Sequence, residues 1–418
     1  MKTRRERTLQ FHQQIHSEWS HHYWNFISQF TDSINWKIMC QNPNLTWEII
    51  QMNLQNPNLE WNSISKNPSI TEEMVRSHPN LPWCWTGLSL NPNITWNFVK
   101  DNLDQYWNWT YLSKHPNLTW NDIKNNLNKP WDWYELSMHK NITWKIVQEN
   151  IHLGWDWSRM SCNPNITWKI VRDNPQYDWS FYWLSCHPNI TLDVVLNNRD
   201  KPWFWFTLSS NPSLNDYEIE ENLDLPWNWK VLSWNPSITW KLISNNPGKD
   251  WDWEHISENP SITWHIVKNN LHKPWYWYGI SKNKNMTAKM IEEKIYDLWH
   301  NEEEPQVKED YNTCERTVFD CNINQNLCLQ GLAENPNLTF DIIRQTADEP
   351  WDWDEISANT FPYEKESFLL KRLNTYMAAY RIQQWWFKIS LSPRYKIGRK
   401  LIEKRRMEIM MDIKEDYA

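Results

Sequence analysis

Apolar and polar positions repeat every 24 residues through most of the chain. Trp-x-Trp pairs begin at Trp83, Trp107 and Trp131 and continue at this spacing to Trp275, with Phe181 in place of one second tryptophan. An apolar residue and a serine follow in each of these copies. Repetition of this length indicates an array of stacked structural units.

The same frame can be extended outward in both directions. Further copies begin at Ile34, Leu59, Trp299, Leu327 and Trp351. About fourteen units then occupy residues 33–358, with an irregular unit at 295–334. We therefore predict an N-terminal cap region at 1–32, a tandem-repeat array at 33–358 and a C-terminal helical basic segment at 359–418.

The second half of the unit carries the signals of a short helix. A threonine follows an aliphatic residue, and Val or Ile stands four positions later, as in Thr95 and Val99. The hydroxyl can cap the first turn, while the flanking apolar residues form a hydrophobic staple. An asparagine seven positions after the threonine, such as Asn102, suits a left-handed residue that ends a helix. The predicted N-caps include Thr95, Thr119, Thr143, Thr167, Thr239 and Thr263.

The first half of the unit is open to two interpretations, because Trp-x-Trp alternates as a strand does. The residue between the two tryptophans is often a cap former, as at Asn108 and Asp132, and proline often precedes the pair. Both features favour a second short helix. Leucine-rich or β-helix repeats need a longer strand pattern than the unit contains. The fold class is therefore all-α: an elongated α-solenoid of two-helix units, followed by a C-terminal amphipathic helix.

The tryptophan columns are the predicted core of the array. A helix of about two turns is marginal alone, so each unit must bury its apolar residues against its neighbours. Each buried indole also needs an acceptor, which the carbonyl groups of the Asn- and Pro-rich turns can supply. The clearest core candidates are Trp107, Trp109, Trp120, Trp131, Trp133, Trp144, Trp155, Trp157, Trp168, Trp251, Trp253 and Trp264.

Composition narrows the possible functions. Only 6 glycines accompany 35 tryptophans and 23 prolines, which argues against glycine-rich phosphate loops. The net charge of -8 argues against general binding to nucleic acid or anionic lipid. We find no nucleophile elbow or paired metal-ligand motif, and therefore expect no enzyme, no catalytic residue, no cofactor and no metal. Cys314, Cys321 and Cys328 share a spacing of seven, but structural zinc needs a closer pair and a fourth ligand.

Targeting signals are missing from the sequence. The basic start is followed by no apolar signal region, and no window approaches the 18 or so apolar residues of a membrane span. Seven cysteines, an odd number, form no disulfide framework. We expect an intracellular protein that is neither secreted nor membrane-spanning.

The C-terminal segment differs in charge from the rest of the chain. Between 381 and 406 it contains nine basic residues and one acidic residue, Glu403. Apolar residues recur there at helical spacing, which could suit a membrane surface, a nucleic acid or a calmodulin-like partner, or a cap on the last repeat. The interaction candidates are Arg381, Trp385, Trp386, Lys388, Arg394, Lys396, Arg399, Lys400, Lys404, Arg405 and Arg406.

The repeat strings NPNITWKIV and PWDWxxLSxNP resemble an uncharacterised tryptophan-rich repeat of giant nucleocytoplasmic DNA viruses, the relatives of mimivirus. The resemblance covers about three quarters of the chain, and the segment from Ala378 to Arg406 looks like a C-terminal helix of proteins from those viruses. It implies the repeat architecture, a viral origin and an interaction role in the infected host cytoplasm or the virion. No catalytic residue comes with that family.

The leading functional hypothesis is a monomeric, non-catalytic scaffold for protein partners. Its binding surface would use the variable column two positions after the cap: Glu48, Glu73, Asn97, Asn121, Lys145, Lys169, Asp193, Tyr217, Lys241, His265, Lys289 and Asp341. The alternative is binding of single-stranded nucleic acid or a membrane surface through the basic C-terminal helix. Stacking of exposed tryptophans on sugars is a further possibility.

Overall fold

A computed structural model describes residues 4–293 and 327–390, together with 397, 399–401, 403 and 404. All regular secondary structure in these residues is helical. The all-α repeat architecture predicted from the sequence is thus confirmed. The chain divides into two compact units, one formed by Tyr23–Phe361 and the other by Met1–His22 with Pro362–Ala418.

Each repeat contributes a first helix that begins at the second aromatic position of the Trp-x-Trp pair or its equivalent. The described residues contain thirteen first helices: α2 (Trp36–Met39), α4 (Trp61–Lys66), α6 (Trp85–Leu88), α8 (Trp109–Ser113), α10 (Trp133–Ser137), α12 (Trp157–Met160), α14 (Phe181–Ser185), α16 (Trp205–Leu208), α18 (Trp229–Leu232), α20 (Trp253–Glu258), α22 (Trp277–Lys282), α24 (Leu329–Glu334) and α26 (Trp353–Ala358).

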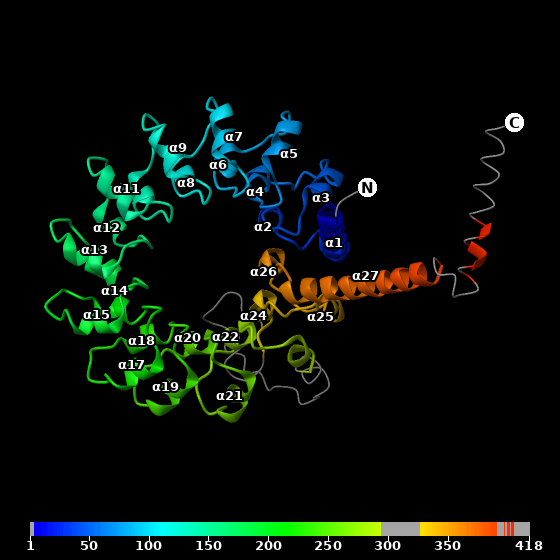
Figure 1. Cartoon of the computed structure of the whole chain (residues 1–418). Helices are drawn as coiled ribbons and strands as arrows, with labels where there is room; N and C mark the ends of the chain where they lie inside the picture. Colours follow the sequence, from blue (N-terminus) through cyan, green and yellow to red (C-terminus); the bar gives the residue numbers. More distant parts are fainter. Residues whose placement is uncertain (1–3, 294–326, 391–396, 398, 402, 405–418) are drawn as a thin grey trace. The chain divides into compact units, whose positions relative to one another are not determined.

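The second helices begin directly after the threonine column. They are α3 (Trp47–Met52), α5 (Glu72–Ser77), α7 (Trp96–Asp101), α9 (Trp120–Lys124), α11 (Trp144–Glu149), α13 (Trp168–Asp173), α15 (Leu192–Leu196), α17 (Asp216–Glu220), α19 (Trp240–Asn245), α21 (Trp264–Asn269) and α25 (Phe340–Gln345). In the unit Tyr23–Phe361 the first helices lie on the inner side of the array and the second helices on its outer side (Figure 1).

The ends of the second helices show how the repeat sequence sets helix length. The hydroxyl of each of the six predicted caps accepts a hydrogen bond from a backbone N–H in the first turn: Thr95, Thr119, Thr143, Thr167, Thr239 and Thr263. At the other end, Asn102 is not left-handed, because its φ is -132°. Its side-chain amide instead donates to the carbonyl of Phe98 at 2.8 Å and satisfies a free C=O of the last turn. The left-handed interpretation of this column was therefore wrong.

The first tryptophan of each pair is fixed by the backbone carbonyl five residues before it, which in most units belongs to an asparagine and otherwise to His78 or Thr346. The indole N–H of Trp107 donates to the carbonyl of Asn102 at 2.7 Å, and that of Trp131 to Asn126 at 2.9 Å. The same bond, always five residues back, recurs in the other regular units. One asparagine thus ends a helix and anchors the next aromatic side chain.

A ladder of buried polar side chains joins each unit to the one before it. The Asn91 amide donates to the carbonyls of Ser65, Asn67 and Ile70 at 3.0, 3.0 and 3.2 Å. In most units the backbone N–H that opens the first helix donates to a serine hydroxyl of the preceding unit, as Cys84 does to Ser65 at 2.9 Å, whereas Glu60 donates to the Cys40 sulfur. These bonds satisfy backbone groups that the short helices leave free.

Histidine replaces asparagine at three positions of this ladder. His115, His139 and His187 are buried, and each Nε2 lies 2.8–3.0 Å from a carbonyl oxygen of the preceding unit. Each Nδ1 accepts a hydrogen bond from the backbone N–H two residues later. Burial lowers the pKa of all three imidazoles. With one nitrogen donating and the other accepting, the neutral form fits this site.

The first and last repeats are joined by the same ladder. The N–H of Asn35 donates to the Ser357 hydroxyl at 3.0 Å, and the Asn42 amide donates to the carbonyls of Ser357 and Asn359 at 2.9 and 3.0 Å. The repeats therefore form a closed array. The sequence analysis did not predict this closure, because sequence periodicity does not reveal the rotation between units.

The ladder also crosses the irregular region directly. The N–H of Cys328 donates to the Ser281 hydroxyl at 2.7 Å, and the Asn335 amide donates to the Ser281 carbonyl at 2.6 Å. The units that contain α22 and α24 are thus neighbours. The copy predicted at Trp299 and most of the irregular unit at 295–334 fall outside the described residues.

The last repeats pack against the end of α1 (Arg4–Ile27). Tyr23 and Phe26 are buried, and the Phe26 ring stacks on Phe340 with centroids 4.1 Å apart. Phe361 is buried beside them and has a φ of 48°. A left-handed conformation is unfavourable for a residue with a side chain, so the aromatic packing must offset it. Residues 23–32 of the predicted cap region thus belong with the repeats.

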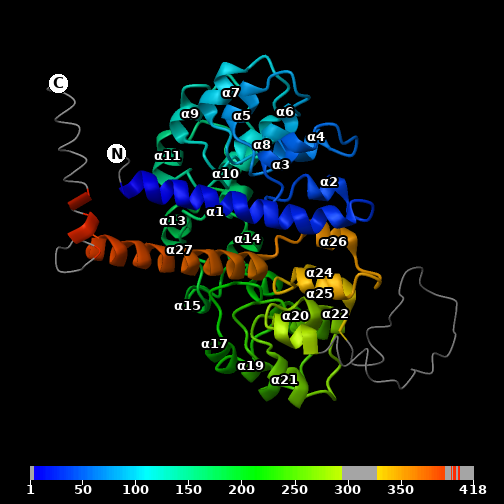
Figure 2. The same ribbon diagram turned by 90° about the vertical axis from the view of Figure 1, so that its right-hand side faces the viewer.

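The other compact unit pairs the remainder of α1 with α27 (Pro362–Ser390). Figure 2 shows these two long helices side by side. Phe11 stacks against Tyr376 with ring centroids 3.9 Å apart, and Glu18 pairs with Arg372. The predicted N-terminal and C-terminal segments therefore form one unit in which α1 and α27 run antiparallel.

Candidate interaction surfaces

The predicted core tryptophans occupy two environments. The four predicted core residues that are the first tryptophan of a pair are all buried: Trp107, Trp131, Trp155 and Trp251. The second-position and second-helix tryptophans are half-buried: Trp109, Trp120, Trp133, Trp144, Trp157, Trp168, Trp253 and Trp264. Trp109 meets Trp131 of the next unit edge to face, with centroids 5.2 Å apart. The half-buried indoles therefore pack between neighbouring units and also reach the surface.

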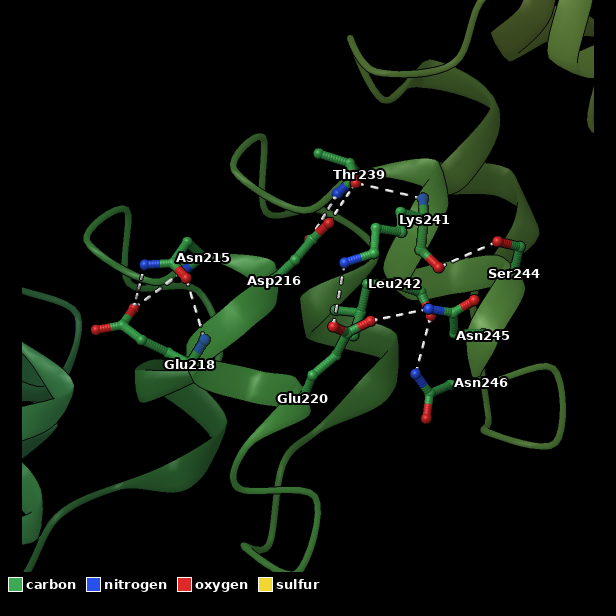
Figure 3. Close-up of polar contacts among 10 residues, drawn as sticks. All are labelled: Asn215, Asp216, Glu218, Glu220, Thr239, Lys241, Leu242, Ser244, Asn245 and Asn246. Atoms are coloured by element: carbon green, nitrogen blue, oxygen red, sulfur yellow. Dashed lines mark hydrogen bonds and ion pairs between the residues drawn. The ribbon is translucent and has the colours of Figure 1, made fainter.

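The variable column of the second helices is exposed at all twelve positions proposed from the sequence. Near α17 and α19, however, polar side chains in and beside this column form hydrogen bonds and an ion pair with residues of the neighbouring unit (Figure 3). Glu220 accepts from Asn245 at 3.0 Å and lies 3.4 Å from the Lys241 ammonium. Asp216 accepts from the backbone N–H of Thr239 at 3.0 Å. Many polar groups of this outer surface are therefore bonded within the array.

The first helices present a second surface that sequence analysis missed. In α10 the buried residues are Leu136 and Ser137. By helical geometry, the positions one, two and five after the first residue of the helix face the opposite side. We define the first-helix surface as these positions in every first helix; in α10 they are Tyr134, Glu135 and Met138. Variation in these columns was visible in the sequence but masked by the stronger tryptophan pattern.

Aromatic residues gather on this surface from α10 to α18. We define the aromatic sector as Tyr134, Tyr182, Trp183, Phe206 and Trp234 of this surface, together with Phe204, the residue that precedes α16. Phe206 and Trp234 are 54% and 56% exposed. The Arg159 guanidinium lies 3.9 Å from the Tyr134 ring centroid and 5.2 Å from that of Trp183, so neighbouring units are in contact across the surface. The Tyr182 and Phe204 rings are 5.6 Å apart.

Acidic residues occupy the same surface from α20 to α26. We define the acidic sector as Glu254, Glu258, Glu334, Asp354 and Glu355. Lys282 lies among them, 2.8 Å from a Glu334 oxygen, and this hydrogen bond raises the pKa of Lys282. Burial and the nearby Glu334 carboxylate raise the pKa of Glu355. The Lys282 ammonium therefore offsets only part of the negative charge of the acidic sector.

Side chains typical of catalytic or metal-binding sites do not cluster in the part of the chain that the structure describes. No three His, Cys, Asp or Glu side chains there are placed to hold a metal ion. Cys328 is buried at the start of α24, whereas Cys314 and Cys321 lie outside the described residues. Burial raises the pKa of Cys162 to about 11, so this thiol is a weak nucleophile at neutral pH. Two cavities beside Trp96 and Trp264 each have room for about one water molecule.

The C-terminal interaction candidates are partly described. Side chains that are exposed on helical backbone are Arg381, Trp385, Trp386, Lys388, Arg399, Lys400 and Lys404. Arg394, Lys396, Arg405 and Arg406 lie outside the described residues. Trp385 is 59% exposed, which is unusual for so large an apolar side chain. None of the helices in the described ranges is both long enough and apolar enough to span a bilayer.

Comparisons of the chain with protein-family models, with curated proteins and with solved structures find no match. The arrangement of side chains on the two repeat surfaces and on α27 is therefore the basis for the functional argument below.

Proposed function

We propose that the protein is a non-catalytic scaffold that binds other proteins through the exposed side chains of its repeats. The supporting observation is that one set of residues in each unit bonds the repeats together while a different set is exposed. The constant residues, such as Asn91 and Ser65, are used in bonds between repeats, whereas the exposed columns differ from unit to unit. A variable surface on a constant core is how repeat proteins recognise irregular partners.

The proposal includes a monomeric scaffold that works without cofactor or metal. The resemblance to repeat proteins of giant DNA viruses extends it to a viral protein acting in the infected host cytoplasm or within the virion. Mass spectrometry of purified virions tests the second location, since a packaged protein is recovered in a fixed ratio to structural proteins. Its recovery only from infected-cell lysate would exclude packaging.

Affinity capture of the full chain, followed by mass spectrometry, tests the scaffold itself. One variant carries serine at Trp385 and Trp386, and a second carries glutamate at Lys145, Lys169 and Lys241 together with serine at Phe206. Loss of partners from the second variant alone would support binding through the repeats. If the unaltered chain enriches no protein over a mock capture, the scaffold proposal fails.

The basic C-terminal helix is a second candidate, favoured by the exposure of Trp385 and Trp386 beside Arg381 and Lys388. Aromatic side chains with adjacent basic residues suit an anionic membrane surface. We expect the full chain to sediment with vesicles that contain phosphatidylserine, and substitution of serine for both tryptophans to abolish sedimentation. Equal sedimentation with purely zwitterionic vesicles, or preferential binding to a single-stranded oligonucleotide, would contradict this role.

A further inference from the structure

The aromatic sector is an exposed, largely aromatic surface that no element among the described residues of its own compact unit covers. Its side chains come from the repeats of α10, α14, α16 and α18, with Arg159 of α12 between the Tyr134 and Trp183 rings, and Tyr134, Phe204, Phe206 and Trp234 are each between 42% and 56% exposed. Isolated exposed apolar residues need no explanation, but a contiguous group of this kind marks an interaction site in a folded protein. Aromatic side chains are also the residues most enriched at binding hot spots.

The charge around this sector restricts the partner. The first-helix surface continues from Trp234 into the acidic sector, beginning at Glu254 and Glu258. Within that sector Lys282 is already paired with Glu334. An anionic partner such as nucleic acid would meet repulsion there, whereas lysine or arginine side chains would be attracted. Arg159 is occupied between two aromatic rings and offers little to a phosphate.

The spacing of the repeats favours an extended segment over a globular domain. Neighbouring helices pack roughly 8–10 Å apart, so the six first helices from α10 to α20, where the acidic sector begins, follow a path on the order of 45 Å. An extended polypeptide advances about 3.3 Å per residue, so roughly fourteen residues would follow this path. Apolar side chains on one face of such a segment could contact successive repeats.

Resting on the proposed scaffold function, we propose that the first-helix surface binds an extended polypeptide segment that combines apolar residues with lysine or arginine. The apolar side chains contact the aromatic sector, and the basic side chains contact the acidic sector. The binding energy comes mainly from burial of Phe206 and Trp234. The acidic sector sets the polarity of the partner and accelerates its association.

Fluorescence anisotropy with the purified full chain tests this assignment. The probe is a labelled peptide of about fourteen residues, with leucine alternating with serine along the part that follows α10 to α18 and lysine at the end that reaches α20, a length set by the estimate above. Two comparison peptides replace every lysine with glutamate or every leucine with serine. We expect the lysine–leucine peptide to bind at least about tenfold more tightly than either comparison peptide, because both kinds of contact contribute.

Variants locate the binding. Phe206→Ser and Trp234→Ser change exposed side chains, and each is expected to weaken binding by about tenfold. Tyr217→Ser is the matched control, since Tyr217 is a 70% exposed aromatic residue on the second helix α17. Glu254→Gln combined with Glu258→Gln is expected to weaken binding and reduce its dependence on salt. Circular dichroism of each variant verifies that the fold is intact.

Three outcomes would overturn the inference: equal affinity for the lysine–serine peptide, tighter binding of the glutamate–leucine peptide or of a single-stranded oligonucleotide, or an equal loss of affinity in Tyr217→Ser. Affinity capture with the double variant Phe206→Ser and Trp234→Ser separates this inference from the scaffold proposal. An unchanged set of partners would reject the first-helix surface while leaving a scaffold, whereas absence of partners for the unaltered chain would reject the scaffold.

Discussion

The outer surface near α17 and α19 and the aromatic sector of the first helices display side chains of opposite character. On the outer surface Glu220 is bonded to Lys241 and Asn245 of the next unit, so these polar groups are paired within the array. In the aromatic sector Phe206 and Trp234 leave more than half of their surface exposed. Exposure alone therefore does not identify a binding surface; unsatisfied apolar area is more informative.

The largest expected effect distinguishes the aromatic sector from the core beneath it. Trp131 is buried and bonded through its indole, whereas Tyr134 lies on the first-helix surface. Trp131→Ala should lower the free energy of unfolding by about 3–5 kcal/mol, as truncation of a core tryptophan does. Tyr134→Ser should cost about 1 kcal/mol or less. Denaturant unfolding measures both, and similar losses would mean that the aromatic sector is part of the core.

A second comparison uses two asparagines with different surroundings. Asn91→Ala removes one donor from each of three buried carbonyls and should cost about 2–3 kcal/mol. Asn245→Ala on the outer surface should leave the unfolding midpoint nearly unchanged, because its bond to Glu220 is exposed to solvent. Hydrogen exchange should show faster opening in the repeats next to Asn91. Opening spread evenly over the whole array would instead show that closure makes the repeats one cooperative unit.

The histidines of the ladder predict a pH dependence that neither surface shares. His115, His139 and His187 have lowered pKa values in the folded protein, while in the unfolded chain they titrate near 6.5. Protons are then taken up by the unfolded chain first, so stability is complete above pH 6.5 and falls as the pH drops below it. The slope is at most about 1.4 kcal/mol per pH unit for each histidine.

Replacing all three histidines with asparagine, the usual residue of this column, should flatten that dependence below about pH 6.5. Chemical denaturation at a series of pH values provides the measurement, with His265→Asn on the exposed second helix α21 as control. An unchanged slope in the triple variant would show that other groups cause the acid sensitivity.

The smallest effect concerns the ion pairs of the outer surface. Lys241→Ala removes the contact with Glu220, yet the lysine is 70% exposed and water screens the pair. The thermal midpoint should shift by no more than about 1 °C. A clearly larger shift in differential scanning calorimetry would make the outer pairs a structural element and weaken the contrast with the aromatic sector.

Interactions between residues close together in the sequence were the most predictable features of this fold. The threonine caps and the acceptors of the buried indoles follow from short-range patterns, and both are present at Thr95 and Trp107. The repeat period also predicted the all-α array. These features depend on residues within about five positions of one another, where sequence spacing translates directly into geometry.

Contacts between units were harder to predict. Asn91 looked like a turn residue, because nothing in the sequence shows that its amide reaches carbonyls 21 to 26 residues earlier. Closure through Asn42 and Ser357 joins positions more than 300 residues apart. It depends on small rotations that add up over all repeats. The aromatic sector escaped notice because its positions vary, whereas pattern recognition favours constant columns.

Closure also constrains how such a protein can change over evolution. An open solenoid accepts duplication or deletion of a repeat, since only its length is altered. Here every added repeat would displace Asn42 from the carbonyls of Ser357 and Asn359 unless all other junctions readjusted. The geometry of closure therefore constrains the number of repeats as well as their sequence. New residues are accommodated more readily between two repeats that stay bonded to each other, as α22 and α24 do, than as an additional member of the array.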